Sequence, residues 1–183
     1  MGGVNGAEAL KALYALQEKD LEIDRLRAEA ESLPEELVAL QGQVETLEER
    51  LTNLLERRAE LEREYNRHSL DIEDLSAKEK QAEEEQKRAQ SAREQTQYEN
   101  RIQQIKDRIR ELLELSTPIM EAMENLEAEI AQVEEELAAL RPRLQELLEA
   151  NRARVAELEA AIAAKVEERT AMAAAIPAQS AQE

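Results

Sequence analysis

The chain has 183 residues, a length that suits one globular domain, but its composition is not that of a globule. Phe and Trp are absent, Tyr occurs three times and 36% of the residues are charged, which leaves too few large apolar side chains for a thick core. The formal net charge of −18 disfavours binding of the whole chain to a phosphate backbone, and the lack of Cys excludes a disulfide, a thiolate zinc site and a Cys nucleophile.

No membrane segment or signal peptide is expected. No apolar run approaches the ~20 residues needed to cross a bilayer, so no membrane partner is expected. The opening MGGVNG has the composition of a flexible leader and lacks the charged and then apolar segments of a signal peptide. The sequence therefore predicts a flexible leader over residues 1–6, a disordered tail over residues 178–183 and a cytoplasmic location.

The first predicted helix covers residues 7–32 and ends at a proline. Its apolar positions are broader than a strict coiled-coil stripe, so this helix is expected to contact more than one neighbour. Pro34 disfavours helical angles at Leu33, which places the N-cap of the next helix at Ser32 or Leu33. The second predicted helix then covers residues 35–90.

Two apolar stripes dominate the rest of the chain. Spacings that alternate between three and four residues keep one face of a helix against a partner helix. The first stripe runs through Leu37, Leu40, Val44, Leu47, Leu51, Leu54, Leu61, Tyr65, Ile72 and Leu75, and the second through Tyr98, Ile102, Ile105, Ile109, Leu112, Ile119, Met123, Leu126, Ile130, Val133, Leu137, Leu140, Leu144 and Leu147.

Because no stripe joins the two, the chain is predicted to turn back at residues 90–96. The expected fold is all-α: a single long antiparallel coiled-coil helical hairpin over residues 7–177, kinked near Pro34, Pro118 and Pro142, with its third helix over residues 97–175. The alternative is one uninterrupted helix through this region, which would form a longer rod.

Two S/T-x-x-E capping boxes compete at the turn, Ser91 to Glu94 and Thr96 to Glu99. Thr96 is preferred because the stripe restarts at Tyr98. A turn near residue 93 or 94 places residue i opposite roughly 187 − i, give or take three residues. At the centre of that range, Arg58 faces Glu129 and Glu79 faces Arg108.

Polar residues in the stripes have a structural interpretation. Asp20, Arg58, Glu79, Ser116 and Asn151 occupy seam positions, where they cost stability but restrict the allowed register and partner. His68 is the only His, and no further donors at metal-ligand spacing accompany it. Because no nucleophile motif, glycine-rich phosphate loop or dry pocket is indicated, we expect no catalytic residue, no metal site, no cofactor and no enzyme activity.

A basic segment at the predicted turn is the candidate functional site. Residues 86–110 carry seven basic and three acidic side chains. The candidate partner-binding residues are Lys87, Arg88, Arg93, Gln97, Tyr98 and Arg101. They would suit a protein partner or a nucleic acid, although Tyr98 is the only aromatic residue there that could stack on a base. The alternative is that the cations only balance neighbouring glutamates.

Two segments resemble a bacterial family of coiled-coil proteins that carry a C-terminal zinc ribbon. They are LYALQEKDLEIDRL at residues 13–26 followed by LPEEL at 33–37, and TQYENRIQQI at 96–105 leading into RELLE at 110–114. The resemblance implies a helical hairpin usually followed by a four-cysteine zinc ribbon, and links to nucleic acid, an alternative sigma factor, flagella or secretion. Zinc is expected only if a ribbon follows, because this chain has no Cys.

Three functional hypotheses follow. The first is a non-enzymatic scaffold or adaptor that presents the hairpin tip, or the joint at Pro34, to a protein partner. The second is a nucleic-acid-associated regulatory factor, related to transcription or a sigma factor, that acts through the basic tip or through a zinc ribbon absent from this chain. The third is an oligomerising spacer, in which hairpins associate along their acidic faces or at the Ala-rich segment 160–175.

Overall fold

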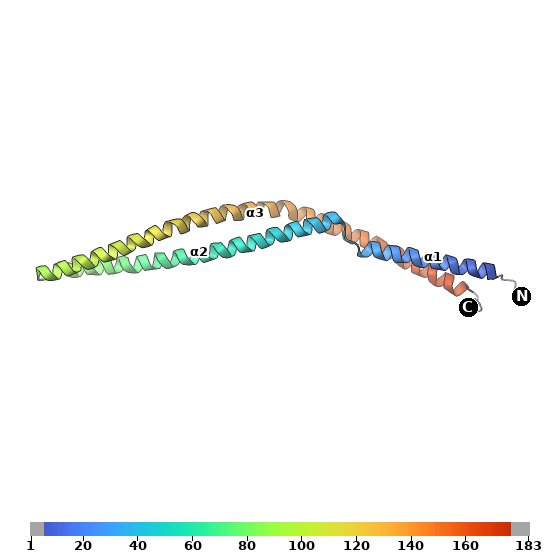
Figure 1. Cartoon of the computed structure of the whole chain (residues 1–183), viewed down its shortest axis with the longest axis horizontal. Helices are drawn as coiled ribbons and strands as arrows, with labels where there is room; N and C mark the ends of the chain where they lie inside the picture. Colours follow the sequence, from blue (N-terminus) through green and yellow to red (C-terminus); the bar gives the residue numbers. More distant parts are fainter. Residues whose placement is uncertain (1–5, 177–183) are drawn as a thin grey trace. The chain divides into compact units, whose positions relative to one another are not determined.

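A computed structural model describes residues 6–176, which form three helices (Figure 1). They are α1 Gly6–Glu31, α2 Glu35–Lys87 and α3 Ala92–Ala175. Residues 6–176 contain no strand, so the prediction of an all-α fold is confirmed. The predicted tail at 178–183 lies outside the described residues, as does the predicted leader except for Gly6, the first residue of α1.

The helices are divided between two compact units. Unit 1 comprises residues 1–44 and 139–183, and unit 2 comprises residues 45–138. In unit 1, α1 and the start of α2 pack against the C-terminal part of α3. In unit 2, the rest of α2 runs antiparallel to the N-terminal part of α3 (Figure 1). The predicted antiparallel coiled-coil hairpin is therefore confirmed.

The core of unit 2 is a thin seam between α2 and α3. Leu112 and Leu137 are the most completely buried leucines there, with 1% and 0% of their surface exposed. The predicted stripes supply every buried apolar residue of this unit except Ala82, because a 3.5-residue repeat keeps one face of each helix on its partner. These residues are Leu61, Ala82, Ile102, Ile105, Leu112, Ile119, Ile130, Val133 and Leu137.

The polar residues predicted for the seam are indeed partly or fully buried. Arg58, Glu79 and His68 are half-buried, and Ser116 is buried with its hydroxyl donating a 2.7 Å hydrogen bond to the carbonyl of Leu112. That bond satisfies the serine within its own helix, so no partner is needed across the seam.

α3 remains helical through both of its internal prolines. Pro118 and Pro142 are exposed, as is Glu114, the residue whose carbonyl loses its amide donor at Pro118. Water can solvate a carbonyl on an exposed face, which explains why the helix tolerates the lost backbone bond. The bends expected at these two prolines stay predictions.

The joint at Pro34 forms as expected, with a small shift. Residues 32–34 are not helical, and the carbonyl of Pro34 accepts a 3.1 Å bond from the amide of Val38, the first bond of α2. Pro34 is therefore the N-cap, and the assignment of that position to Ser32 or Leu33 is wrong. Glu35 and Glu36 in the first turn favour this helix end, since its amides carry partial positive charge.

The register in unit 2 lies two residues from the centre of the predicted range and within it. Arg58 pairs with Glu127 at 2.8 Å and Glu79 pairs with Lys106 at 3.8 Å. Both predicted partners, Glu129 and Arg108, are therefore wrong. Within unit 2, residue i of α2 therefore faces residue 185 − i of α3 rather than 187 − i.

An exchange of charges at Arg58 tests this register. R58E should lower the thermal midpoint, because it places a second carboxylate beside Glu127. Adding E127R should restore the midpoint, measured by circular dichroism at low salt. Adding E129R instead should not restore it, and an equal recovery with E129R would contradict the observed register.

Candidate partner-binding tip

A four-residue turn joins α2 to α3 without glycine. α2 ends at Lys87 and α3 begins at Ala92. The amides of Arg88 and Ala89 bond the carbonyls three residues earlier, of Glu85 and Gln86, each at 3.1 Å. These bonds tighten the last turn of α2, and none of residues 6–176 adopts a positive φ.

Ser91 caps the start of α3. Its hydroxyl accepts a 3.1 Å bond from the amide of Glu94, and the Glu94 carboxylate accepts a 3.3 Å bond from the amide of Gln90. Thr96 lies inside the helix, where its hydroxyl donates to the carbonyl of Ala92. The preference for Thr96 as the cap, with a turn over residues 90–96 and a helix from 97, is therefore wrong.

One further contact braces the turn from α2. The Gln86 side-chain amide donates a 3.3 Å hydrogen bond to the carbonyl of Gln95. Behind it, Ala82 and Ile102 are buried and Tyr98 is half-buried, so the seam continues to the end of the hairpin. The turn therefore rests on a packed support rather than on a long loop.

The cations of the tip are exposed, and most have no ionic partner. Lys87 pairs with Glu84 at 3.7 Å within its own helix. Arg88, Arg93 and Arg101 are exposed and form no ion pair with any other residue in 6–176. Three guanidinium groups, each with a planar set of donors, are thus available to carboxylates of another molecule.

The fold also brings acidic residues to the same place. Because α2 and α3 are antiparallel, the last turns of the hairpin comprise residues 84–101. This segment contains four basic side chains (Lys87, Arg88, Arg93 and Arg101) and four acidic ones (Glu84, Glu85, Glu94 and Glu99), so its formal charge is zero. At the very end of the hairpin the cations are therefore matched by an equal number of carboxylates.

The other candidate residues have different roles. Gln97 is exposed beside the arginines. Tyr98 is half-buried, which limits the ring face that it can offer to a base. No cluster of three or more His, Asp or Glu side chains suited to a metal ion occurs in the part of the chain that the structure describes.

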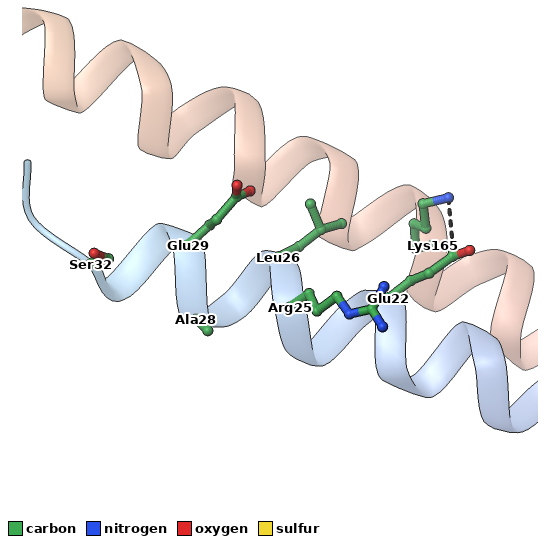
Figure 2. Close-up of a pocket in the computed structure, with 7 residues that line it drawn as sticks. All are labelled: Glu22, Arg25, Leu26, Ala28, Glu29, Ser32 and Lys165. Atoms are coloured by element: carbon green, nitrogen blue, oxygen red, sulfur yellow. Dashed lines mark ion pairs between the residues drawn. The ribbon is translucent and has the colours of Figure 1, made fainter.

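A groove lies on unit 1 along the C-terminal half of α1 (Figure 2). It has a volume of about 690 Å³, and Lys165 of α3 contributes one side of it. Figure 2 shows Lys165 directed at Glu22, with which it forms a 3.0 Å ion pair. The Glu22 carboxylate and the Lys165 ammonium group therefore neutralise each other within the groove. Its lining residues are Glu22, Arg25, Leu26, Ala28, Glu29, Ser32 and Lys165.

The comparisons with known proteins agree with this architecture. A family model described as the CT398-like coiled coil hairpin domain matches residues 16–181. The chain belongs to this family. A solved structure from Mycobacterium smegmatis is similar to the chain, with a TM-score of 0.76 and 25% identity over 94% of this chain and 72% of that one. No curated protein matches the chain.

Membership of the CT398-like hairpin family confirms the coiled-coil part of the resemblance found in the sequence. The family is named for a hairpin of helices, a fold typical of structural and interaction proteins. No described helix is both long enough and apolar enough to span a membrane.

Sequence reasoning missed one functional group of unit 1. Arg154 is half-buried on α3, and its guanidinium donates to the carbonyls of Glu29 at 2.9 Å and Ser32 at 2.7 Å. Asn151, which the seam pattern did single out, accepts a third bond from it at 2.9 Å. The lack of a Gly or basic residue at the end of α1 was the available signal that another helix supplies the cap.

Proposed function

We propose that the chain is a non-enzymatic scaffold or adaptor that presents its hairpin tip to a protein partner. The observation that carries this proposal is the set of three exposed arginines, Arg88, Arg93 and Arg101, without ion pairs in the described residues. Unpaired guanidinium groups on a braced turn suit a surface with carboxylates, because each can form a bidentate contact there. The proposal keeps the cytoplasmic location expected from the sequence.

A protein fits this tip better than a nucleic acid does. A phosphate backbone would meet the glutamates of residues 84–101 together with the cations, and the net charge there is zero. A protein surface with both signs of charge can match each group individually, which provides specificity. The half-buried Tyr98 supports the same preference, since stacking on bases needs an exposed ring.

Cross-linking in the native cell tests the proposal. A photoreactive group at the exposed Gln97 of the full chain should capture one specific set of proteins. In the double variant R88E/R93E, the captured amount of these proteins should fall by about tenfold or more, because the charges that pair with the partner are reversed.

The matched control is R63E/R67E, with the photoreactive group still at Gln97. Arg63 and Arg67 are exposed on α2, away from the turn, and form no ion pair within residues 6–176, so the change in charge is the same. Capture should persist in this variant. Equal recovery of the same proteins by the tip variant and the control would contradict a role for the tip.

Titration with salt tests the nucleic-acid alternative. A nucleic-acid factor would bind DNA or RNA with an affinity that falls steeply as salt rises, and R88E/R93E would reduce that slope. No binding at low salt is expected from the balanced charge of the tip. Binding with a steep slope that the double variant abolishes would favour the alternative over a protein partner.

A further inference from the structure

α1 meets α3 through apolar side chains that are mostly half-buried, such as Leu26 and Leu158. Among the residues of α1 only Ala9 and Ile23 are buried. On the opposite side, the last buried residue of α3 is Leu137, so none of its described residues within unit 1 is fully buried. Hydrophobic burial therefore contributes less to the docking of α1 than to the seam of unit 2, where nine apolar side chains are buried.

Ionic contacts add to these half-buried apolar ones. Lys19 of α1 pairs with Glu168 of α3 at 2.7 Å, and Glu22 of α1 pairs with Lys165 of α3 at 3.0 Å. Lys19 also approaches Glu22 at 3.6 Å on its own helix. The four side chains alternate in sign across the interface, so each carboxylate faces a cation from the other helix.

The polar contacts continue beyond these four side chains. Between Lys19 and Glu22 on α1, Asp20 pairs with Arg169 of α3 at 2.8 Å. At its end, Arg154 donates to the carbonyls of Glu29 and Ser32, where the helix carries partial negative charge. Beyond that contact the chain is non-helical over residues 32–34, so α1 is not a continuation of α2.

We propose that α1 is an arm that ionic contacts hold against α3 and that raised ionic strength releases about the joint at residues 32–34. Release uncovers the apolar stripe of α3 beneath it, which is formed by Val155, Leu158, Ile162 and Val166. The physical basis is that exposed ion pairs weaken as salt screens them, whereas apolar burial does not. Unit 2, which is closed mainly by buried leucine and isoleucine, keeps its pairing under the same conditions.

Distances between spin labels in the full chain test this arm. The chain has no Cys, so paired cysteines introduced at Glu18 and Thr170, which are exposed and lie across the α1–α3 interface, would carry the only labels. Between 0.05 and 1 M NaCl the fraction of molecules with long label distances should rise about fivefold, as the screening length falls from above 10 Å to about 3 Å. A distribution that does not change over this range would overturn the proposal.

A second pair of labels controls for general loosening. Gln81 and Gln104 are exposed and face each other across the seam of unit 2 in the observed register. Their distance should stay constant over the same range of salt. If both pairs broaden together, salt loosens the whole coiled coil and α1 is not a separate arm.

Neighbouring charges on α3 provide a matched pair of variants. E168Q removes the nearest partner of Lys19, whereas E167Q removes an exposed carboxylate that forms no ion pair in residues 6–176. At low salt, E168Q should show the released arm and E167Q should not. Equal distributions of label distances in E168Q and E167Q would contradict the proposal that ion pairs hold α1 against α3.

Acidification should release the arm as well. Hydrogen bonds from Lys165 and Lys19 hold the pKa of Glu22 and of Glu168, respectively, below the usual value of 4.5. Because each carboxylate has a lower pKa when α1 is docked, its negative charge stabilises docking above pH 4.5, and this stabilisation is lost as the pH falls through the lowered pKa.

Lys19 responds at the other end of the pH range. The hydrogen bond to Glu168 raises the pKa of Lys19 above 10.5, so the stabilisation from its positive charge is present below pH 10.5 and is lost as the pH rises through the raised pKa. As the two carboxylates become protonated below about pH 4.5, the distance between the labels at Glu18 and Thr170 should therefore lengthen. It should do so at a higher pH than the distance between the labels at Gln81 and Gln104.

Discussion

Replacing Leu112 by Ala is expected to destabilise the hairpin by about 3 kcal/mol, because the leucine is closed off from solvent in the seam of unit 2. Only 1% of its surface is exposed, so the substitution removes buried methyl groups and leaves a cavity between α2 and α3. Chemical denaturation followed by circular dichroism would measure the change. A loss of this size is a large part of the stability of a single domain.

The adjacent Leu113 provides the control, since it has the same chemistry on the same turn of α3 and 53% of its surface is exposed. L113A should change the stability by no more than about 0.5 kcal/mol, because its side chain is already largely in water. If L112A and L113A lose similar amounts of unfolding free energy, Leu112 does not lie in a buried seam between α2 and α3. The comparison cancels helix propensity, which is the same for both substitutions.

The positions of the seam were readable from the sequence because periodicity reports directly on which face of a helix is buried. Leu112 and Leu137 belong to predicted stripes and are almost completely buried. The break at Pro34 was also readable, since proline restricts the residue before it and cannot donate a backbone bond. Both features depend on residues that are close to one another in the chain, so a single sequence is enough to predict them.

The turn and the register were not readable to the same precision. Ser91 and Thr96 both satisfy the S/T-x-x-E pattern, and only the structure shows Ser91 as the cap while the Thr96 hydroxyl bonds the carbonyl of Ala92. Because α3 therefore begins earlier than predicted, the partner of Arg58 moves from Glu129 to Glu127. An error of a few residues in the position of a turn therefore shifts the predicted ion pairs between the two helices that it joins.

In α1 two of the observed ion pairs lie at the centre of the predicted register, and the third, Asp20–Arg169, lies two residues from it. Lys19 faces Glu168, where residue numbers sum to 187, as predicted. The non-helical residues 32–34 account for this, because an extended residue advances up to about 3.3 Å and a helical one only 1.5 Å. α3 therefore needs about three more residues to keep level with the joint, and this offsets the error made at the turn.

The charge of the candidate site was readable only in part. Counting along residues 86–110 gave an excess of cations, but that count leaves out the glutamates of α2 that the fold places beside them, such as Glu84 and Glu85. Charge along a sequence and charge in space differ in an antiparallel hairpin, since the residues of one helix face those of another. The free arginines, not the net charge, are therefore what distinguishes the tip.

Replacing Arg154 by Leu is expected to free the end of α1. The guanidinium bonds the carbonyls of Glu29 and Ser32, and these groups have no Gly cap or basic residue in the last turn of α1 to replace it. Bonds from a charged donor to such carbonyls are worth about 2 kcal/mol together, so amide protection in the last turns of α1 should fall roughly thirtyfold. Hydrogen exchange followed by mass spectrometry would measure the loss segment by segment.

Two variants separate this cap from general effects of charge and packing. R152L removes an exposed arginine two residues away that has no ion pair in the described residues, and it should leave the protection of α1 unchanged. R154K keeps the charge but cannot reach both carbonyls with one planar fork, so its protection should lie between those of wild type and R154L. Protection in α2 and in the first half of α3 should be the same in all three variants, because their seam does not depend on Arg154. If R152L lowers the protection of α1 as much as R154L does, positive charge on α3 holds α1 in place and the two carbonyl bonds do not.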